Sequence, residues 1–457
     1  MSSTKVAQAD IVADDSQDVP LKTMVGWGIG SLAIATLYNT TNMLLLRYLV
    51  DYVGIAAALA STLIAFSKVY DTVTDPLMGV ITDRTKSPLG RRRPWLFVGS
   101  FLCAMALPLL FITPQGMSDP VLITWVVFGL LFYASAYTGF SVPYMAMPAE
   151  MTDDPHQRSV IFSWRVKAIA LGQVVAGGGA PALIVYFGAG QEGHAGMSLV
   201  LGAIILVTAL LSFRYTREAR ALPMVKSDKP QFRDQVRTLL ADKNLVWLLN
   251  AKMVHLVAVA FGASSFAFFT LRVLGLPDTY LSLIIVSSTV GILASAPPLT
   301  MLSRHIGKQN TYSLSVGIYA VIHVWWYYAT PDDGVFLMGL RGFIMGVGGS
   351  GMMLMAQSLL SDVMADDRTR TGNSREGVYA GLYTTIEKFS YAVGIAIVGV
   401  LLGGAGYIEG NAAGIDQPQS ALDVIRLSVS FIPAGLAILA AIAMHRVRPS
   451  TAVTPRM

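Results

Sequence analysis

Long apolar runs dominate this chain, and their length limits what it can fold into. A helix needs about 20 mostly apolar residues to cross the hydrocarbon core of a membrane. The runs that meet this requirement lie near residues 24–50, 55–81, 95–114, 120–147, 159–188, 196–214, 245–274, 278–303, 310–329, 334–361, 376–407 and 421–444. The sequence therefore predicts an all-α membrane protein with twelve transmembrane helices.

The composition excludes several other classes of protein. Only 13% of the 457 residues are charged and 54% are hydrophobic, whereas soluble proteins average about 25% charged residues. The net charge of +5 does not indicate nucleic-acid binding, because Lys and Arg lie between apolar runs and not among aromatic residues. The single cysteine, Cys103, excludes a disulfide within the chain. No metal-ligand or catalytic motif is present, so we expect neither a cofactor nor enzymatic activity.

The distribution of basic residues predicts the topology. Most of the 33 Lys and Arg residues fall in segments on one side of the predicted spans, and the predicted outer loops hold only Arg47 and Arg272. By the positive-inside rule, both termini are expected in the cytoplasm and the chain in the inner membrane. The expected parts are a disordered cytoplasmic tail (1–20), a six-helix bundle (21–215), a cytoplasmic linker (216–244), a second six-helix bundle (245–445) and a cytoplasmic tail (446–457).

Two carboxylates interrupt the second apolar run. Asp71 and Asp75 are one helical turn apart, so they share a face of the predicted helix. An ionised carboxylate in the bilayer costs roughly 2.5–3.5 kcal/mol on insertion scales. This cost favours a cation or proton site, and the simpler alternative is a local ion pair with Lys68.

The turn after these carboxylates predicts a gate. Residues 79–86 and the basic run 90–93 resemble the signature loop between helices two and three of the major facilitator superfamily, in which two six-helix halves enclose a central site. Asp83 can pair with arginines in one transport state and release them in another. The candidate gating residues of this loop are Asp83, Arg91, Arg92 and Arg93. The alternative is a basic loop that only sets the topology.

Several stretches narrow this resemblance. They are residues 70–79, 90–95, 143–152, 362–366 and 375–377, together with Glu387 and Lys388. These stretches resemble the glycoside–pentoside–hexuronide:cation symporter family, whose melibiose permease-like members couple solute uptake to an ion. The resemblance implies that Asp71, Asp75 and Lys388 form the cation site, with Thr74 and Thr138 assisting. It leaves sodium and proton coupling open.

The substrate site departs from the melibiose pattern. Ala35 and Ser141 occupy positions in helices one and four where that pattern has sugar-binding carboxylates. The remaining candidates for substrate binding are Tyr38, Asn42, Ser141, Arg165, Tyr383, Thr384 and Lys388. Arg165 has no acid near it in sequence, so three roles are open: it holds an anionic solute, extends to the membrane surface, or pairs with a carboxylate at a helix end.

Four further charged residues flank the cytoplasmic loops and complete the expected gate. They are Glu150 and Arg158 in the first half and Asp362 and Arg375 in the second. The predicted function is cation-coupled symport of a sugar-like or other small polar solute by a monomeric protein. The alternatives are a lysolipid carrier of the same fold and a membrane receptor that does not transport.

Overall fold

The computed structural model describes residues 19–114, 116–152, 154–217, 219, 241–371, 376–410 and 416–448. Every regular element within these residues is helical, which confirms the all-α fold. In chain order the elements are α1 (Leu21–Arg47), the π-helical turn η1 (Tyr48–Tyr52), α2 (Ala57–Arg84), α3 (Arg93–Phe111), α4 (Asp119–Met151), α5 (Pro155–Val174), the π-helical turn η2 (Val175–Gly179), α6 (Ala180–Tyr186), α7 (Gly190–Tyr215), α9 (Lys243–Phe268), the π-helical turn η3 (Phe269–Val273), α10 (Asp278–Ile306), α11 (Lys308–Tyr327), the 3₁₀ turn η4 (Pro331–Asp333), α12 (Gly334–Thr371), α13 (Glu376–Gly404), α14 (Gln419–Val429) and α15 (Phe431–Met444).

Ten helical segments of the described chain are long and apolar enough to cross a membrane. The other two predicted spans, 55–81 and 310–329, correspond to α2 and α11, which pack lengthwise among these ten. The charged side chains of α2 lower its hydropathy. The predicted tails and most of the predicted linker (1–18, 220–240 and 449–457) lie outside the described residues.

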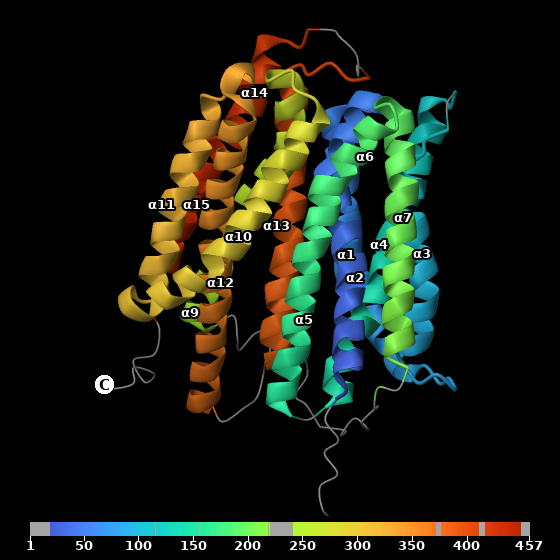
Figure 1. Cartoon of the computed structure of the whole chain (residues 1–457), viewed down its shortest axis with the longest axis vertical. Coiled ribbons are helices and arrows are strands. Elements are labelled where there is room, and N and C mark those ends of the chain that lie inside the picture. Colours follow the sequence, from blue (N-terminus) through green and yellow to red (C-terminus); the bar gives the residue numbers. More distant parts are fainter. Residues whose placement is uncertain are drawn as a thin grey trace, which may run out of the picture.

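The helices form two groups that lie side by side (Figure 1). One group holds α1 to α7, and the other holds α9 to α15. The groups meet chiefly where α2 packs on α13, where α10 packs on α5, η2 and α6, and where α1 packs on α9. The basic loop 84–93 lies at the lower end in Figure 1, which we call the basic end. The end that carries η1 and η3 is called the opposite end.

The two halves repeat one another most clearly at the opposite end. In the first half the amide of Val53 donates to the Tyr48 carbonyl, and Gly54 follows with a positive φ of 85°. In the second half the amide of Leu274 donates to the Phe269 carbonyl, and Gly275 follows with φ of 63°. A residue with a side chain rarely adopts such a φ, so glycine permits the sharp turn into the next helix. This shared backbone supports a structural repeat.

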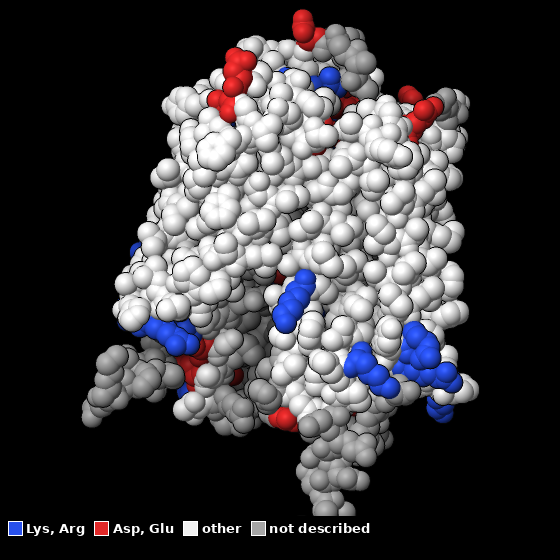
Figure 2. Space-filling model, in the orientation of Figure 1, with Lys and Arg blue, Asp and Glu red and all other residues white. Residues whose placement is uncertain are grey.

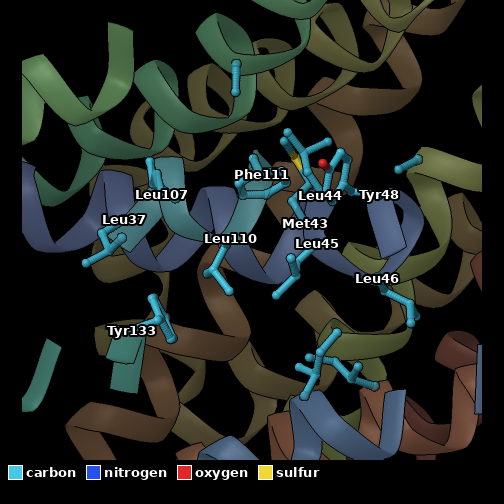
Figure 3. Close-up of a cluster of buried hydrophobic side chains, with 14 of the residues drawn as sticks. Leu37, Met43, Leu44, Leu45, Leu46, Tyr48, Leu107, Leu110, Phe111 and Tyr133 are labelled. Carbon is cyan, nitrogen blue, oxygen red and sulfur yellow. The ribbon is translucent and has the colours of Figure 1, made fainter. Parts of the chain in front are cut away.

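Leucine and aromatic side chains pack together in the first half. Leu107, Leu110 and Phe111 of α3 pack against the face of α1 and η1 that presents Leu44 and Tyr48 (Figure 3). The rings of Tyr48 and Phe111 have centroids 5.2 Å apart. Because lipid is as apolar as these side chains, close packing and not the exclusion of water stabilises such contacts in a membrane.

Candidate functional site

Asp75 on α2 joins the two halves near the middle of the bundle. Its Oδ1 accepts a hydrogen bond of 2.7 Å from the Thr138 hydroxyl on α4. Its Oδ2 accepts a hydrogen bond from Lys388 Nζ on α13, in the other half. Lys388 therefore pairs with an acid of the other half and not with its neighbour Glu387. The Asp75 side chain keeps 29% of its surface exposed, so solvent reaches it.

Asp71 lies one turn away and is almost fully buried. Its Oδ1 has no hydrogen-bond partner, although Lys68, Lys388 and Asp75 are close enough to interact with it electrostatically. A buried carboxylate oxygen without a partner is costly. The pair of carboxylates with the Thr138 hydroxyl is thus a set of oxygen atoms that suits a hard cation or a proton.

The local alternative for Asp71 was an ion pair with Lys68. The two charges interact electrostatically, but their side chains make no direct ion-pair contact among the described residues. Lys68 instead lies between aromatic rings, with Nζ 4.9 Å from the centroid of Tyr38 and 5.0 Å from that of Tyr133. Its Nζ donates to the Tyr133 hydroxyl at 3.4 Å. The Thr74 hydroxyl donates to the Tyr70 and Asp71 carbonyls of its own helix.

The candidate substrate residues differ in what they offer. Tyr38 lies near the rings of Tyr137 and Tyr391, at centroid distances of 5.9 and 6.0 Å. Asn42 is buried with neither amide atom bonded, and Arg165 Nε is likewise buried without an acceptor. Ser141 and Tyr383 are buried, and the Thr384 side chain lies outside the described residues. Lys388 is held by Asp75.

The position of Ala35 explains one departure from the melibiose pattern. A Cβ at Gly172 of α5 would lie 2.7 Å from the Ala35 Cβ, so α1 and α5 are in close contact here. Ala35 itself is buried. A carboxylate at this position would clash with α5, so the structure provides no place for one.

Sequence reasoning missed a second charged pair in the interior. Lys252 of α9 donates to Glu387 of α13 at 3.0 Å and to the Tyr383 carbonyl at 2.9 Å. The sequence did contain a pattern that marks Glu387. Tyr383, Glu387 and Tyr391 follow one another at intervals of four residues, so they share one face of α13.

A network of buried charges between the halves was also missed. Arg47 donates to both carboxylate oxygens of Asp278, at 2.5 and 2.8 Å. Arg272 Nη2 lies 3.3 Å from Asp51 Oδ1, which also accepts a hydrogen bond of 2.6 Å from Tyr407. The prediction that Arg47 and Arg272 lie in outer loops is wrong. They belong to α1 and η3 and are buried by partners from the opposite half.

At the basic end, the charged pairs among the described residues stay within one half. Arg92 donates to Thr82, to Asp83 and, at 3.0 Å, to Glu150. Arg91 donates to Glu150 at 3.2 Å, and Arg93 donates to the Phe213 carbonyl at 3.1 Å.

Two of the remaining expected gate residues, Arg158 and Asp362, also have hydrogen-bond partners. Arg158 donates to the Thr152 carbonyl at 2.9 Å. In the second half, Lys308 donates to Asp362 at 2.6 and 2.7 Å. Arg375 lies outside the described residues.

Figure 2 shows how charge is distributed over one face of the molecule. The middle is almost entirely uncharged, basic residues gather toward the basic end, and acidic ones gather at the opposite end. A hollow opens between the two groups of helices toward the basic end, and an acidic side chain is visible inside it. An apolar belt around a charged interior that opens at one end defines a membrane transport protein with two helical halves.

Solved structures share this fold. A mutant of the nucleoside transporter NupG matches with a TM-score of 0.63 and 13% identity, over 93% of this chain and 99% of that chain. A bacterial homologue of the human lysosomal transporter Spinster matches with a TM-score of 0.65 and 13% identity, over 94% of this chain and 98% of that chain. At such low identity these matches show the fold alone, which is that of the major facilitator superfamily.

Sequence comparison identifies the family. A family profile described as MFS/sugar transport protein matches residues 26–449. The putative glycoside/cation symporter YagG of Escherichia coli (strain K12) is 26% identical over 90% of this chain and 88% of its own length. The glucuronide carrier protein homolog of the same organism is 24% identical over 93% and 92%. The chain belongs to the glycoside–pentoside–hexuronide:cation symporter family of the major facilitator superfamily.

Membership of this family confirms the broad functional prediction. The protein is an integral inner-membrane secondary transporter of small solutes and not an enzyme. Its symporter relatives imply a small-molecule substrate and a coupling cation as its partners.

Proposed function

We propose that the protein couples the inward movement of a monovalent cation, sodium or a proton, to the uptake of a sugar-like or other small polar solute. The observation that carries this proposal is the geometry at Asp75, which Thr138 and Lys388 hold beside buried Asp71. Lys388 donates a hydrogen bond to Asp75, one of the two carboxylates. A monovalent cation bound between Asp71 and Asp75 would replace that contact and neutralise one of the two carboxylate charges, and the nearby Lys388 ammonium would still offset the other. This lowers the cost of closing the site and favours the loaded return step.

Alternating access fits the contacts at the two ends. At the opposite end, the halves are tied by Arg47–Asp278 and Asp51–Arg272. At the basic end, the pairs Arg92–Asp83 and Lys308–Asp362 each stay within one half. The hollow in Figure 2 opens on that side. In the proposed topology, the basic end and both termini lie in the cytoplasm. The structure then corresponds to an inward-open state. The proposed transporter acts as a monomer.

Proteoliposomes of defined internal composition test the coupling. The solute comes from a thermal-shift screen of the purified protein against neutral sugars, uronates and lysolipids, with and without sodium and at two pH values. We expect Asp71→Asn and Asp75→Asn to abolish concentrative uptake of that solute while leaving some exchange. The matched control is Asp423→Asn, an exposed acid on α14. Full accumulation by either carboxylate variant contradicts the proposal.

A second candidate substrate class is an anionic solute such as a uronate. Arg165 supports it, because its buried Nε lacks an acceptor and its charge reaches Tyr137 in the interior. In the same screen, stabilisation by uronates but not by the matching neutral sugars would favour this class. Stabilisation by lysolipids without any ion or pH dependence would favour an uncoupled lipid carrier.

A further inference from the structure

Three arginines come together where α3 and α7 reach the basic end, and Figure 2 shows basic side chains gathered over the lower ends of these helices. Arg93 is the first residue of α3, Arg214 lies in the last turn of α7, and Arg217 is the second residue after that helix. Arg217 is close enough to Arg93 to interact with its charge. Among the described residues none of the three forms an ion pair, whereas Arg92, the neighbour of Arg93, binds Glu150 at 3.0 Å. Like charges are thus gathered here, and no described acid pairs with them.

The Arg93 guanidinium is fixed by Phe213 of α7. Its Nη2 donates to the Phe213 carbonyl at 3.1 Å, and its central carbon lies 4.8 Å from the centroid of the Phe213 ring. Among the described residues Nη1 has no acceptor, and it is not buried. Guanidinium groups recognise phosphate through their planar set of N–H donors. The contact with Phe213 therefore orients the guanidinium and leaves Nη1 available to an anion.

Apolar side chains continue from the arginines along the outer face of α3. Phe97, Phe101 and Met105 follow Arg93 at intervals of four residues, and all three are exposed. The centroid of the Phe97 ring lies 5.3 Å from that of Phe101 and 5.3 Å from that of Phe213. The surface thus changes from arginine to hydrocarbon within one helical turn, as the boundary between lipid head groups and acyl chains does.

We propose that Arg93, Arg214 and Arg217, which we call the arginine cluster, bind the phosphate of an anionic phospholipid such as phosphatidylglycerol. An acyl chain of this lipid lies against Phe97 and Phe101. A phosphate between the guanidiniums offsets their mutual repulsion and accepts hydrogen bonds from more than one of them. Basic clusters between helices at a membrane surface are suited to anionic head groups. The proposal depends neither on the transported solute nor on the coupling ion.

The chemistry of the arginine cluster favours this occupant over three alternatives. A zwitterionic phospholipid would bring its own positive group beside the guanidiniums, where no described acid pairs with the cluster to receive it. A soluble phosphate would make no use of the exposed rings of Phe97 and Phe101, against which an acyl chain can pack. A signal for topology alone needs only positive charge. It does not need a guanidinium held in place by the carbonyl and ring of Phe213.

The test measures lipid binding to the purified, delipidated full-length protein in detergent by native mass spectrometry. The probes are dioleoyl phosphatidylglycerol, dioleoyl phosphatidylethanolamine and glycerol phosphate. We expect the first phosphatidylglycerol to bind the wild-type protein about tenfold more tightly than phosphatidylethanolamine does. Arg217→Gln should weaken the binding of phosphatidylglycerol roughly fivefold, and the double variant Arg214→Gln/Arg217→Gln should weaken it roughly thirtyfold. Glycerol phosphate should not displace the lipid.

Arg304→Gln is the matched control. Arg304 is an exposed arginine in the last turn of α10, so this variant removes the same charge from the same end of the molecule, and it should bind phosphatidylglycerol as the wild-type protein does. The melting temperature of each variant shows that it is folded.

Three results overturn the inference. The first is equal affinity of the wild-type protein for the two phospholipids, a comparison that needs no variant. The second is a double variant that binds phosphatidylglycerol as tightly as Arg304→Gln does. The third is displacement of the lipid by an equal concentration of glycerol phosphate, which would indicate a site for soluble anions.

Discussion

Asp51 and Arg272 occupy corresponding places in the two halves and pair with one another, with Arg272 Nη2 3.3 Å from Asp51 Oδ1. Asp51 lies in η1 and Arg272 in η3, and each precedes its glycine of positive φ by three residues. The contact therefore crosses the axis that relates the halves. Beside it, Arg47 binds Asp278 with both terminal nitrogens. The two pairs run in opposite directions and close one end of the molecule.

Removing one charge from these two ion pairs should open the opposite end of the molecule. Asp278→Asn leaves Arg47 buried without a charged partner, and such a loss typically costs about 3 kcal/mol. That cost shifts a two-state population by roughly a hundredfold. We expect spin labels at Asp119→Cys and Asp332→Cys, both exposed at the opposite end, to report a longer distance in Asp278→Asn. The labels are attached in a Cys103→Ala background.

Asp423→Asn is the control for this measurement, because Asp423 is an exposed acid of the same end and, among the described residues, accepts its hydrogen bond from Gln419 of its own helix α14. Its distance distribution should match that of the parent. Unchanged distances in both Asp278→Asn and Asp51→Asn would show that the charge pairs do not hold this end closed.

The carboxylate pair and Lys388 could be predicted from the sequence because they belong to recognisable motifs. Asp71 and Asp75 stand out as charges in an apolar run, and family resemblance pointed to Lys388 as their neighbour. Helical spacing placed Lys68 near Asp71, but it gives no information about rings on other helices, and the Lys68 side chain lies between Tyr38 and Tyr133.

The partners in the pairs Lys252–Glu387 and Arg47–Asp278 could not be predicted from the sequence for a different reason, although the pattern on α13 marked Glu387. Each joins residues that are more than a hundred positions apart, on helices that do not follow one another in the chain. Hydrophobic periodicity predicts that a helix exists, but in a membrane it does not give the rotation or depth at which two helices meet. The π-helical turns η1 and η3, which place Asp51 and Arg272, have no compositional signature in the sequence either.

Lys388→Met should increase cation affinity while impairing coupling. Lys388 donates to the same Asp75 carboxylate that is proposed to bind the ion. Lys388 occupies this carboxylate when no ion is bound, so an incoming ion must compete with it. We expect the cation concentration for half-maximal thermal stabilisation to fall at least tenfold, and concentrative uptake to decline. Lys252→Met, which removes a lysine paired with a different acid, should leave the cation response unchanged. An equal or weaker cation response in Lys388→Met would contradict the competition.

Arg92 should be the most sensitive arginine of the basic end. It is 7% exposed and donates to three different side chains, on α2 and α4. Its planar guanidinium serves all three at once, which the single ammonium of lysine cannot do. We expect Arg92→Ala and Arg92→Lys both to lower the melting temperature in detergent. Arg91→Ala, at a side chain 29% exposed with one acid partner, should cost only about 0–1 kcal/mol. Full rescue by lysine would refute this account.

The contact between α2 and α13 gives a test of closure that does not depend on charge. A Cβ at Gly399 would lie 2.1 Å from the Ser61 hydroxyl oxygen and 2.5 Å from the Ala57 carbonyl oxygen, so the two halves approach closely at this glycine. Gly399→Leu should wedge the halves apart at the opposite end, because the Ala57 carbonyl belongs to the backbone and cannot move aside cheaply. We expect the spin-label distance between positions 119 and 332 to lengthen as it does in Asp278→Asn. Gly404→Leu, where no atom lies within 4 Å of the added Cβ, should leave it unchanged. If Gly399→Leu folds and keeps the short distance, the α2–α13 contact is not part of the closure, and the ion pairs alone hold that end together.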